Sequence, residues 1–158
     1  MRRPCAIYNK FKRINIGDNF MDKYMEQIHL EGYEIGYGKV LKTVIDSKIF
    51  NVKQLSEILN ISEKDFRRLI RKSRKHEKEI AEYKIEQQAK KTKGISMYDI
   101  FERIKEMDIQ EGQRSANESI IRNLIGRNTG LTIVQMASLL GLTENEVSKI
   151  ATQGPTII

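Results

Sequence analysis

Cysteine, proline and tryptophan are nearly missing from this chain of 158 residues, which has 1 Cys, 2 Pro and no Trp. A single cysteine cannot form an internal disulfide, so the class of secreted disulfide scaffolds is excluded. The one Cys and two His lack the clustered spacing of a Cys/His zinc site, and we expect no metal or other cofactor. No run of 18 apolar residues occurs and the N-terminus lacks the apolar stretch of a signal peptide. We therefore expect a cytoplasmic protein without membrane spans.

The positions of the two prolines predict an all-α fold. Pro4 and Pro155 lie near the two ends, so the chain between them keeps the backbone donors that helices need. Apolar residues recur there with a period near 3.6, and sustained alternation with period 2 does not occur. The glycines, among them Gly32, Gly36 and Gly112, are interpreted as the punctuation between helices.

An internal repeat of about 80 residues is visible in the sequence. Glu31-Gly32 recurs as Glu111-Gly112, 80 residues later, and after Gly130 the offset becomes 81. With that offset, residues 58–63 align with residues 139–144, mostly by residue class. The pattern indicates a duplicated helical unit. Two unrelated units built on one amphipathic template would also look partly alike.

Each repeat ends in a window of 20 residues, 52–71 and 133–152, that fits the helix-turn-helix pattern. The pattern needs a small residue at its fifth position, which is Ser56 or Ala137, and a turn residue at its ninth, which is Asn60 or Gly141. The apolar positions that fill the wedge between the helices are Leu55, Leu59, Ile61, Phe66 and Leu69 in one window and Met136, Leu140, Leu142, Val147 and Ile150 in the other. A plain αα-corner without DNA contact would satisfy the same pattern.

The two windows differ in the charge of their exposed positions. The chain carries a net charge of +7, and residues 64–93, with 12 Lys and Arg against 5 Asp and Glu, account for all of it. Such a basic segment is typical of proteins that bind nucleic acid. The candidate DNA-binding residues are Lys64, Arg67, Arg68, Arg71, Lys72, Arg74 and Lys75. The matching exposed positions of the second window are Glu144, Asn145, Glu146, Ser148 and Lys149, whose two carboxylates would repel phosphate. We therefore expect DNA to contact the first unit and protein to contact the second.

Five segments follow from these patterns. They are a basic N-terminal segment at 1–17, a first helical unit with a helix-turn-helix-like motif at 18–76, a charged helical linker at 77–93, a second such unit at 94–153, and a tail at 154–158. The expected architecture is two helix-turn-helix-like units joined by a long charged helix.

No catalytic residue is predicted. Glu82-Tyr83-Lys84 matches the E-x-K part of a nuclease motif, but that chemistry needs a β-strand and a second metal-binding acid. Here the triplet lies in a polar helical run. His29 lies beside an apolar stripe, and we expect it at the edge of the core.

Residues 130–150, which read GLTIVQMASLLGLTENEVSKI, and the glycine-spaced segment 31–39 resemble the tails of recombination-promoting nucleases, the transposase-like PD-(D/E)XK family of bacteria. The resemblance covers about 40 residues of each unit. The nuclease domain of that family has no counterpart in this chain, so no catalytic residue carries over. The resemblance implies association with, or interference with, a longer nuclease.

The leading hypothesis is a non-enzymatic DNA-binding protein, a transcriptional regulator of bacteria or phages that uses a basic recognition helix. The alternative is a protein-interaction module, either a homo-oligomerising tail or a nuclease inhibitor. An adaptor that inserts into a larger assembly is a third reading.

Overall fold

The computed structural model describes residues 20–90 and 97–153, and within these ranges the protein contains helices and no strand. The predicted all-α class is confirmed. The helices are α2 (Phe20–Asp46), α3 (Val52–Leu59), α4 (Glu63–Lys90), α5 (Met97–Gly126), α6 (Ile133–Leu140) and α7 (Glu144–Thr152). None of these six helices combines the length and the apolar character needed to cross a membrane.

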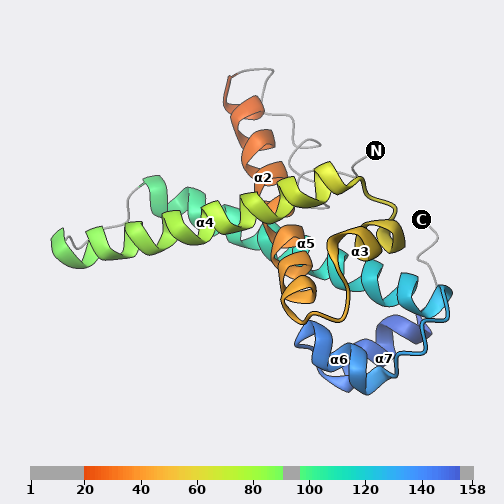
Figure 1. The fold of residues 1–158 in the computed structure, drawn as a ribbon. Helices are drawn as coiled ribbons and strands as arrows, with labels where there is room; N and C mark the ends of the chain where they lie inside the picture. The colour runs from red at the N-terminus through yellow and green to blue at the C-terminus, as the bar shows by residue number, and fades with distance from the viewer. Residues whose placement is uncertain (1–19, 91–96, 154–158) are drawn as a thin grey trace.

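The long helices α2 and α5 cross each other, and glycines lie at the crossing (Figure 1). A Cβ atom at Gly36 would lie 1.9 Å from the carbonyl oxygen of Ile109, and one at Gly112 would lie 2.1 Å from that of Tyr33. Only glycine permits two backbones to approach this closely. The interpretation of Gly32, Gly36 and Gly112 as breaks between helices is therefore wrong, because all three lie inside α2 or α5.

All six helices contribute to one hydrophobic core. Its fully buried members include Leu41 of α2, Leu55 of α3, Phe66 of α4, Ile120 of α5 and Val147 of α7, and α6 adds four buried side chains. The short helices are exchanged between the units, since α3 packs against α5 and α6 packs against α2. The two sequence units are therefore interlocked around a shared core.

Local geometry recurs at the spacing of the sequence repeat. Lys48 and Asn128, 80 residues apart, both have left-handed backbone, with φ of 63° and 52°. Asn60 and Gly141, 81 residues apart, do so at the turns after α3 and α6, with φ of 55° and 68°. Reciprocal capping boxes begin both short helices, from Asn51 to Gln54 and from Thr132 to Gln135.

The helix α4 is much longer than its counterpart α7, with 28 residues against 9. Figure 1 shows it crossing α2 and extending well beyond that crossing, together with the first half of α5. There, His76 Nε2 lies 3.2 Å from the carboxylate of Glu102, and the Tyr83 hydroxyl donates to Asp99 at 2.5 Å. The predicted linker thus continues α4 without a break as far as Lys90. The predicted segments 1–17 and 154–158, and the predicted start of the second unit at Gly94, lie outside the described residues.

Candidate nucleic-acid interface

The first turn of α4 is fixed by the turn that precedes it. The left-handed Asn60 reverses the chain, and Ile61 N–H donates to the Ser56 carbonyl at 3.0 Å. Ser62 then caps α4, because its hydroxyl accepts from Asp65 N–H at 3.1 Å. The buried ring of Phe66 anchors the first turn in the core. The start of α4 is thereby held in one orientation relative to α2 and α3.

One side of α4 faces the core and the other faces solvent. Phe66, Leu69, Ile70, Ser73 and His76 are buried. The opposite side carries a row of exposed cations, which we call the basic stripe: Lys64, Arg67, Arg71, Arg74, Lys75 and Lys78. Arg74 and Lys75 are adjacent, and the other steps are of three or four residues, so all six lie on one helical face. At 1.5 Å per residue they span about 21 Å. Five of the seven predicted DNA-binding residues lie in this stripe.

Arg68 and Lys72, the other two predicted residues, point toward α2. The Arg68 guanidinium donates to Glu34 at 2.6 Å, and the Lys72 ammonium donates to the other carboxylate oxygen of Glu34 at 3.1 Å. The side chain of Glu34 is only 3 % exposed. The two cations therefore compensate a buried carboxylate, and we leave them out of the interface. The sequence offers only a weak signal for this network, an acid that directly precedes Ile35 in α2.

Most cations of the basic stripe are available to bind an anionic partner. Arg67 lies 3.6 Å from Glu63 and Lys75 lies 3.9 Å from Glu79, but these pairs are exposed and on the helix surface, where ion pairs contribute little. Within the described part of the chain, Arg71 and Arg74 form no ion pair. A polyanion could bind this face without first breaking a strong internal contact.

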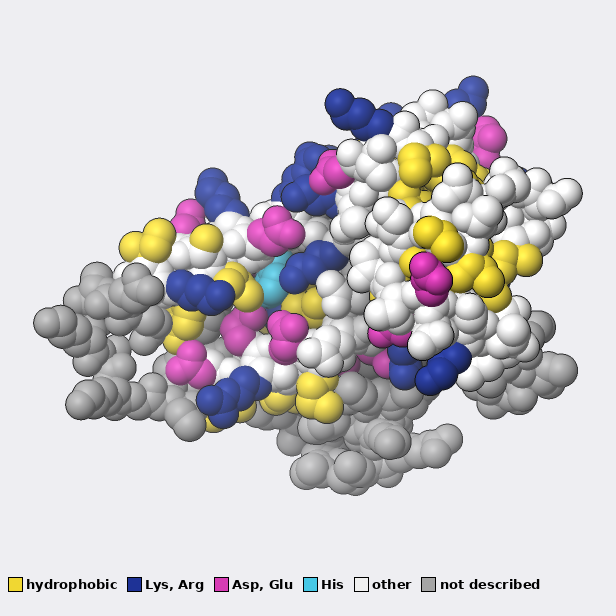
Figure 2. Space-filling model, turned by 90° about the horizontal axis from the view of Figure 1, so that it is seen from below, with side chains coloured by type: hydrophobic (Ala, Val, Ile, Leu, Met, Phe, Trp, Pro, Cys, Tyr) yellow, Lys and Arg dark blue, Asp and Glu magenta, His cyan; other side chains and the backbone are white. Residues whose placement is uncertain are grey.

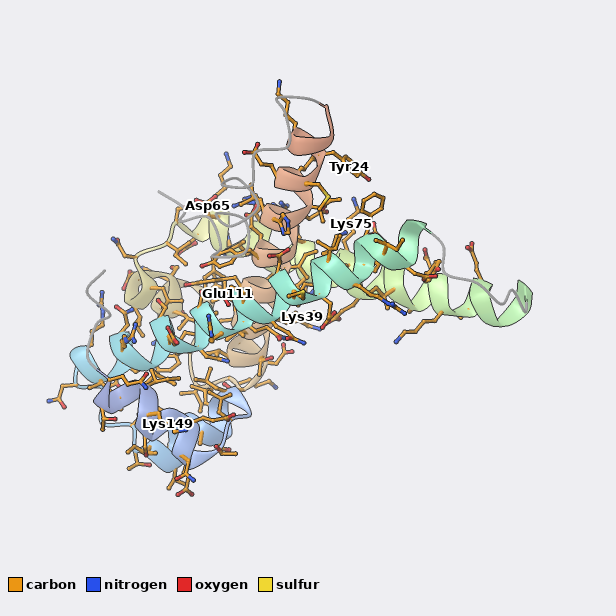
Figure 3. The ribbon with its side chains drawn as sticks, turned by 180° about the vertical axis from the view of Figure 1, so that it is seen from behind. Tyr24, Lys39, Asp65, Lys75, Glu111 and Lys149 are labelled. Atoms are coloured by element: carbon orange, nitrogen blue, oxygen red, sulfur yellow. The ribbon has the colours of Figure 1, made fainter. Side chains whose placement is uncertain are left out.

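The second unit presents a different surface. The carboxylate of Glu146 accepts from Thr143 N–H at 2.9 Å and so completes the cap of α7, while Glu144 adds a second negative charge at the same end. Residues 128–153 contain 3 charged residues of 26, whereas the matching residues 48–72 contain 10 of 25. Figure 3 places Lys149 of α7 far from Lys75 of α4. Among the residues that the structure describes, α7 therefore adds no cationic surface to the basic stripe.

A cleft of 640 Å³ lies between α2, the α3–α4 turn and α5, and Tyr37, Arg68, Ser119 and Arg122 are among its lining residues. Burial raises the pKa of Tyr37 above its ordinary value, although a hydrogen bond with Ser119 lowers it in part. The phenol therefore stays protonated at neutral pH. The acidic partners of the two arginines, Glu34 and Glu118, also line the cleft and balance their charge. With Asp65 the lining holds three carboxylates against two guanidinium groups, so the cleft has no cationic excess that would select an anionic ligand.

His29 belongs to the core, and its contacts are structural. His29 is fully buried, and its Nδ1 pairs with the buried carboxylate of Asp108 across the α2–α5 crossing, so it lies deeper than the predicted core edge. The E-x-K triplet, Glu82-Tyr83-Lys84, lies within α4. No group of three or more His, Cys, Asp or Glu side chains in the described ranges is arranged to hold a metal ion.

Comparison with known proteins adds no relative. The chain matches no protein-family model, no curated protein and no solved structure. The resemblance of both units to nuclease tails thus stays a prediction.

Proposed function

We propose that this chain is a non-enzymatic DNA-binding protein that acts in the cytoplasm as a transcriptional regulator, with α4 as its recognition helix. The observation that carries the proposal is the basic stripe, an exposed row of six cations on a helix whose start is fixed by a helix-turn-helix-like turn. A major groove about 12 Å wide admits one α-helix. Arginine can bind guanine edges or phosphates with two hydrogen bonds, and lysine supplies point charges.

The neighbouring residues support this assignment. Glu34 holds Arg68 and Lys72 against α2, so the cations that remain exposed form one continuous face. The stripe begins at Lys64, which is exposed in the first turn of α4. Neutralising about five phosphates should give a slope near −4.5 for log K against log salt.

The test is a fluorescence-anisotropy titration of random duplex DNA at several salt concentrations. We expect the triple substitution Arg67→Gln, Arg71→Gln and Arg74→Gln to remove most of the affinity and to flatten the slope by about 2.7. The charge-matched control replaces Lys23, Lys84 and Arg103, which are exposed cations outside the stripe. A flat salt response of the wild type, or equal losses in the two triple variants, would contradict the proposal.

The second candidate function is a protein-interaction module, favoured by the small number of charged residues in the part of the second unit that holds α6 and α7. Interface centres are depleted in charged residues, and residues 128–153 carry only Glu144, Glu146 and Lys149. This candidate includes self-association and inhibition of a nuclease. It predicts that the stripe variant keeps its activity, whereas a change on the exposed side of α6 removes it.

A further inference from the structure

Two acids lie beside cations of the basic stripe, one near each end. The carboxylate of Glu63 lies 3.6 Å from the guanidinium of Arg67, and that of Glu79 lies 3.9 Å from the ammonium of Lys75. Both pairs are four residues apart on one helical face. They differ in the cation, because arginine presents a planar fork of donors and lysine a point charge. The pair at the start of α4 thus joins a carboxylate acceptor to a fork of donors.

The start of the stripe is also the end that is placed to reach DNA bases. In helix-turn-helix proteins the N-terminal residues of the recognition helix contact base edges. Beyond the stripe α4 continues with acids, and Glu82 lies four residues after Lys78, on the same face. Figure 2, seen from below, shows Asp and Glu side chains among the Lys and Arg side chains of the arm that α4 forms with the first half of α5. This mixed surface attracts phosphate less than the stripe does, so we expect the duplex to lie over the first turns of α4.

Glu63 and Arg67 together carry the hydrogen-bonding groups that complement a G·C base pair. In the major groove guanine presents two acceptors, O6 and N7, which arginine binds with two hydrogen bonds, and cytosine presents the N4 amino group, from which a carboxylate accepts. Four residues of helix rise about 6 Å, and base pairs are stacked about 3.4 Å apart. The two side chains therefore reach the same base pair or adjacent ones. Their exposed fractions are 62 % for Arg67 and 42 % for Glu63, and such exposed ion pairs are weak enough for DNA to replace.

The second unit lacks this combination. With the offset of 81 residues, Glu144 stands at the position of Glu63, but Ser148 stands at that of Arg67. An acid at both positions is explained by the positive end of the helix macrodipole, so the acid alone indicates no function. The arginine beside it distinguishes the first unit.

We infer that Arg67 and Glu63 read a G·C base pair, with the guanidinium bound to guanine and the carboxylate bound to cytosine. The inference rests on the proposed function and names its target, a duplex site with a G·C pair at the start of α4. On random DNA Arg67 neutralises a phosphate like the rest of the stripe, and on a site with this pair it turns to the base. The later cations of the stripe hold phosphates and supply affinity without sequence preference.

The experiment selects sites from a random duplex library with the full wild-type chain. Fluorescence anisotropy then compares a selected site with the same site after its G·C pair is replaced by A·T. We expect the selected sites to share a G·C pair, and we expect its replacement to weaken wild-type binding about tenfold or more. In Arg67→Ala the replacement should cost less than about twofold. Arg74→Ala, which removes a stripe cation farther along α4, should keep the full cost of replacement.

The two acids supply a matched pair of variants. Glu63→Ala should reduce the cost of replacement about fivefold, because cytosine loses its acceptor. Glu79→Ala removes the same charge beside Lys75 and should leave that cost unchanged. Both variants should bind random DNA somewhat more tightly, since each loses a negative charge near the stripe. Circular dichroism verifies that all four variants are folded.

The outcomes separate this inference from the proposed function. A wild type without salt-dependent binding to random duplex overturns both. Salt-dependent binding without a shared G·C pair in the selected sites overturns the inference alone, because the stripe then contacts only phosphates. The inference also fails if Arg67→Ala or Glu63→Ala keeps the full cost of replacement, or if Arg74→Ala or Glu79→Ala loses it equally.

Discussion

The two units of this protein share a scaffold and differ in what they expose. Phe66 and Val147 are both completely buried at matching positions in α4 and α7, and Asn60 and Gly141 make the same left-handed turn. The outward sides diverge, since the first unit has a long basic helix and the second has a short helix with two acids at its start. Interior positions are thus set by the common packing, while exposed positions are free to take different roles.

The exchange of short helices makes the stability of each unit depend on the other. Because α3 packs on α5 and α6 packs on α2, neither unit covers its apolar surface without the other. The guanidinium of Arg127, the residue directly after α5, also donates to the Glu57 carbonyl of α3 at 2.9 Å. The units can differ in surface function, but we expect them to unfold together.

The largest expected effect is that of a side chain at the α2–α5 crossing. Gly36→Ala places its Cβ atom 1.9 Å from the Ile109 carbonyl oxygen, so the helices must separate. We expect a loss of about 3 kcal/mol or more in the free energy of unfolding, measured by urea denaturation. Far-UV circular dichroism should show one transition, because both units depend on this crossing.

The control for this prediction is Gly126→Ala at the end of α5, where a Cβ atom would have no neighbour within 4 Å. It should leave stability nearly unchanged or raise it slightly. Two separate transitions in the Gly36→Ala protein, with one at the wild-type midpoint, would show that the units fold independently.

A smaller effect distinguishes the two kinds of cation on α4. Arg68→Gln removes a donor to buried Glu34, and we expect a loss of about 1 kcal/mol in stability with an unchanged salt slope for DNA. Arg71→Gln removes an exposed cation of the basic stripe. It should leave stability unchanged and reduce the salt slope by about 0.9. Urea denaturation and anisotropy on the same two variants measure both quantities.

A reduced salt slope in Arg68→Gln would show that Arg68 belongs to the DNA interface. If Arg68→Gln reduced the salt slope as much as Arg71→Gln, the contact with Glu34 would have to open when DNA binds. The two substitutions remove the same charge from positions three residues apart, so each serves as the control for the other.

Local patterns explain which features could be predicted from the sequence. Helical class, the limits of α3, α6 and α7, and the left-handed turns depend on nearby residues, and periodicity and capping signals report them. The crossing at Gly36 and the pairing of Glu34 with Arg68 join segments more than 30 residues apart. A glycine that ends a helix and one that meets a neighbouring backbone look alike in a single sequence. The position of Gly36 four residues after Gly32 is the only local hint.

The candidate site was predictable only in part for the same reason. Net charge located it on α4, and the helical period places the basic stripe on one face once the helix limits are known. Periodicity cannot tell which flank of α4 meets α2, so Arg68 and Lys72 could not be separated from Arg67 and Arg71. That distinction requires the position of Glu34, which tertiary packing sets.

The smallest expected effect concerns the caps of the two matching helices, α4 and α7. The Thr143 hydroxyl accepts from Glu146 N–H at 3.2 Å, and Ser62 makes the equivalent contact with Asp65 at 3.1 Å. We expect Thr143→Ala to lower the free energy of unfolding by about 1 kcal/mol and Ser62→Ala to lower it by less. A helix of 9 residues depends more on its end than one of 28, whose buried face supplies further stability. Urea denaturation of both variants tests this order, and equal losses would show that α7 is held mainly by the burial of Val147.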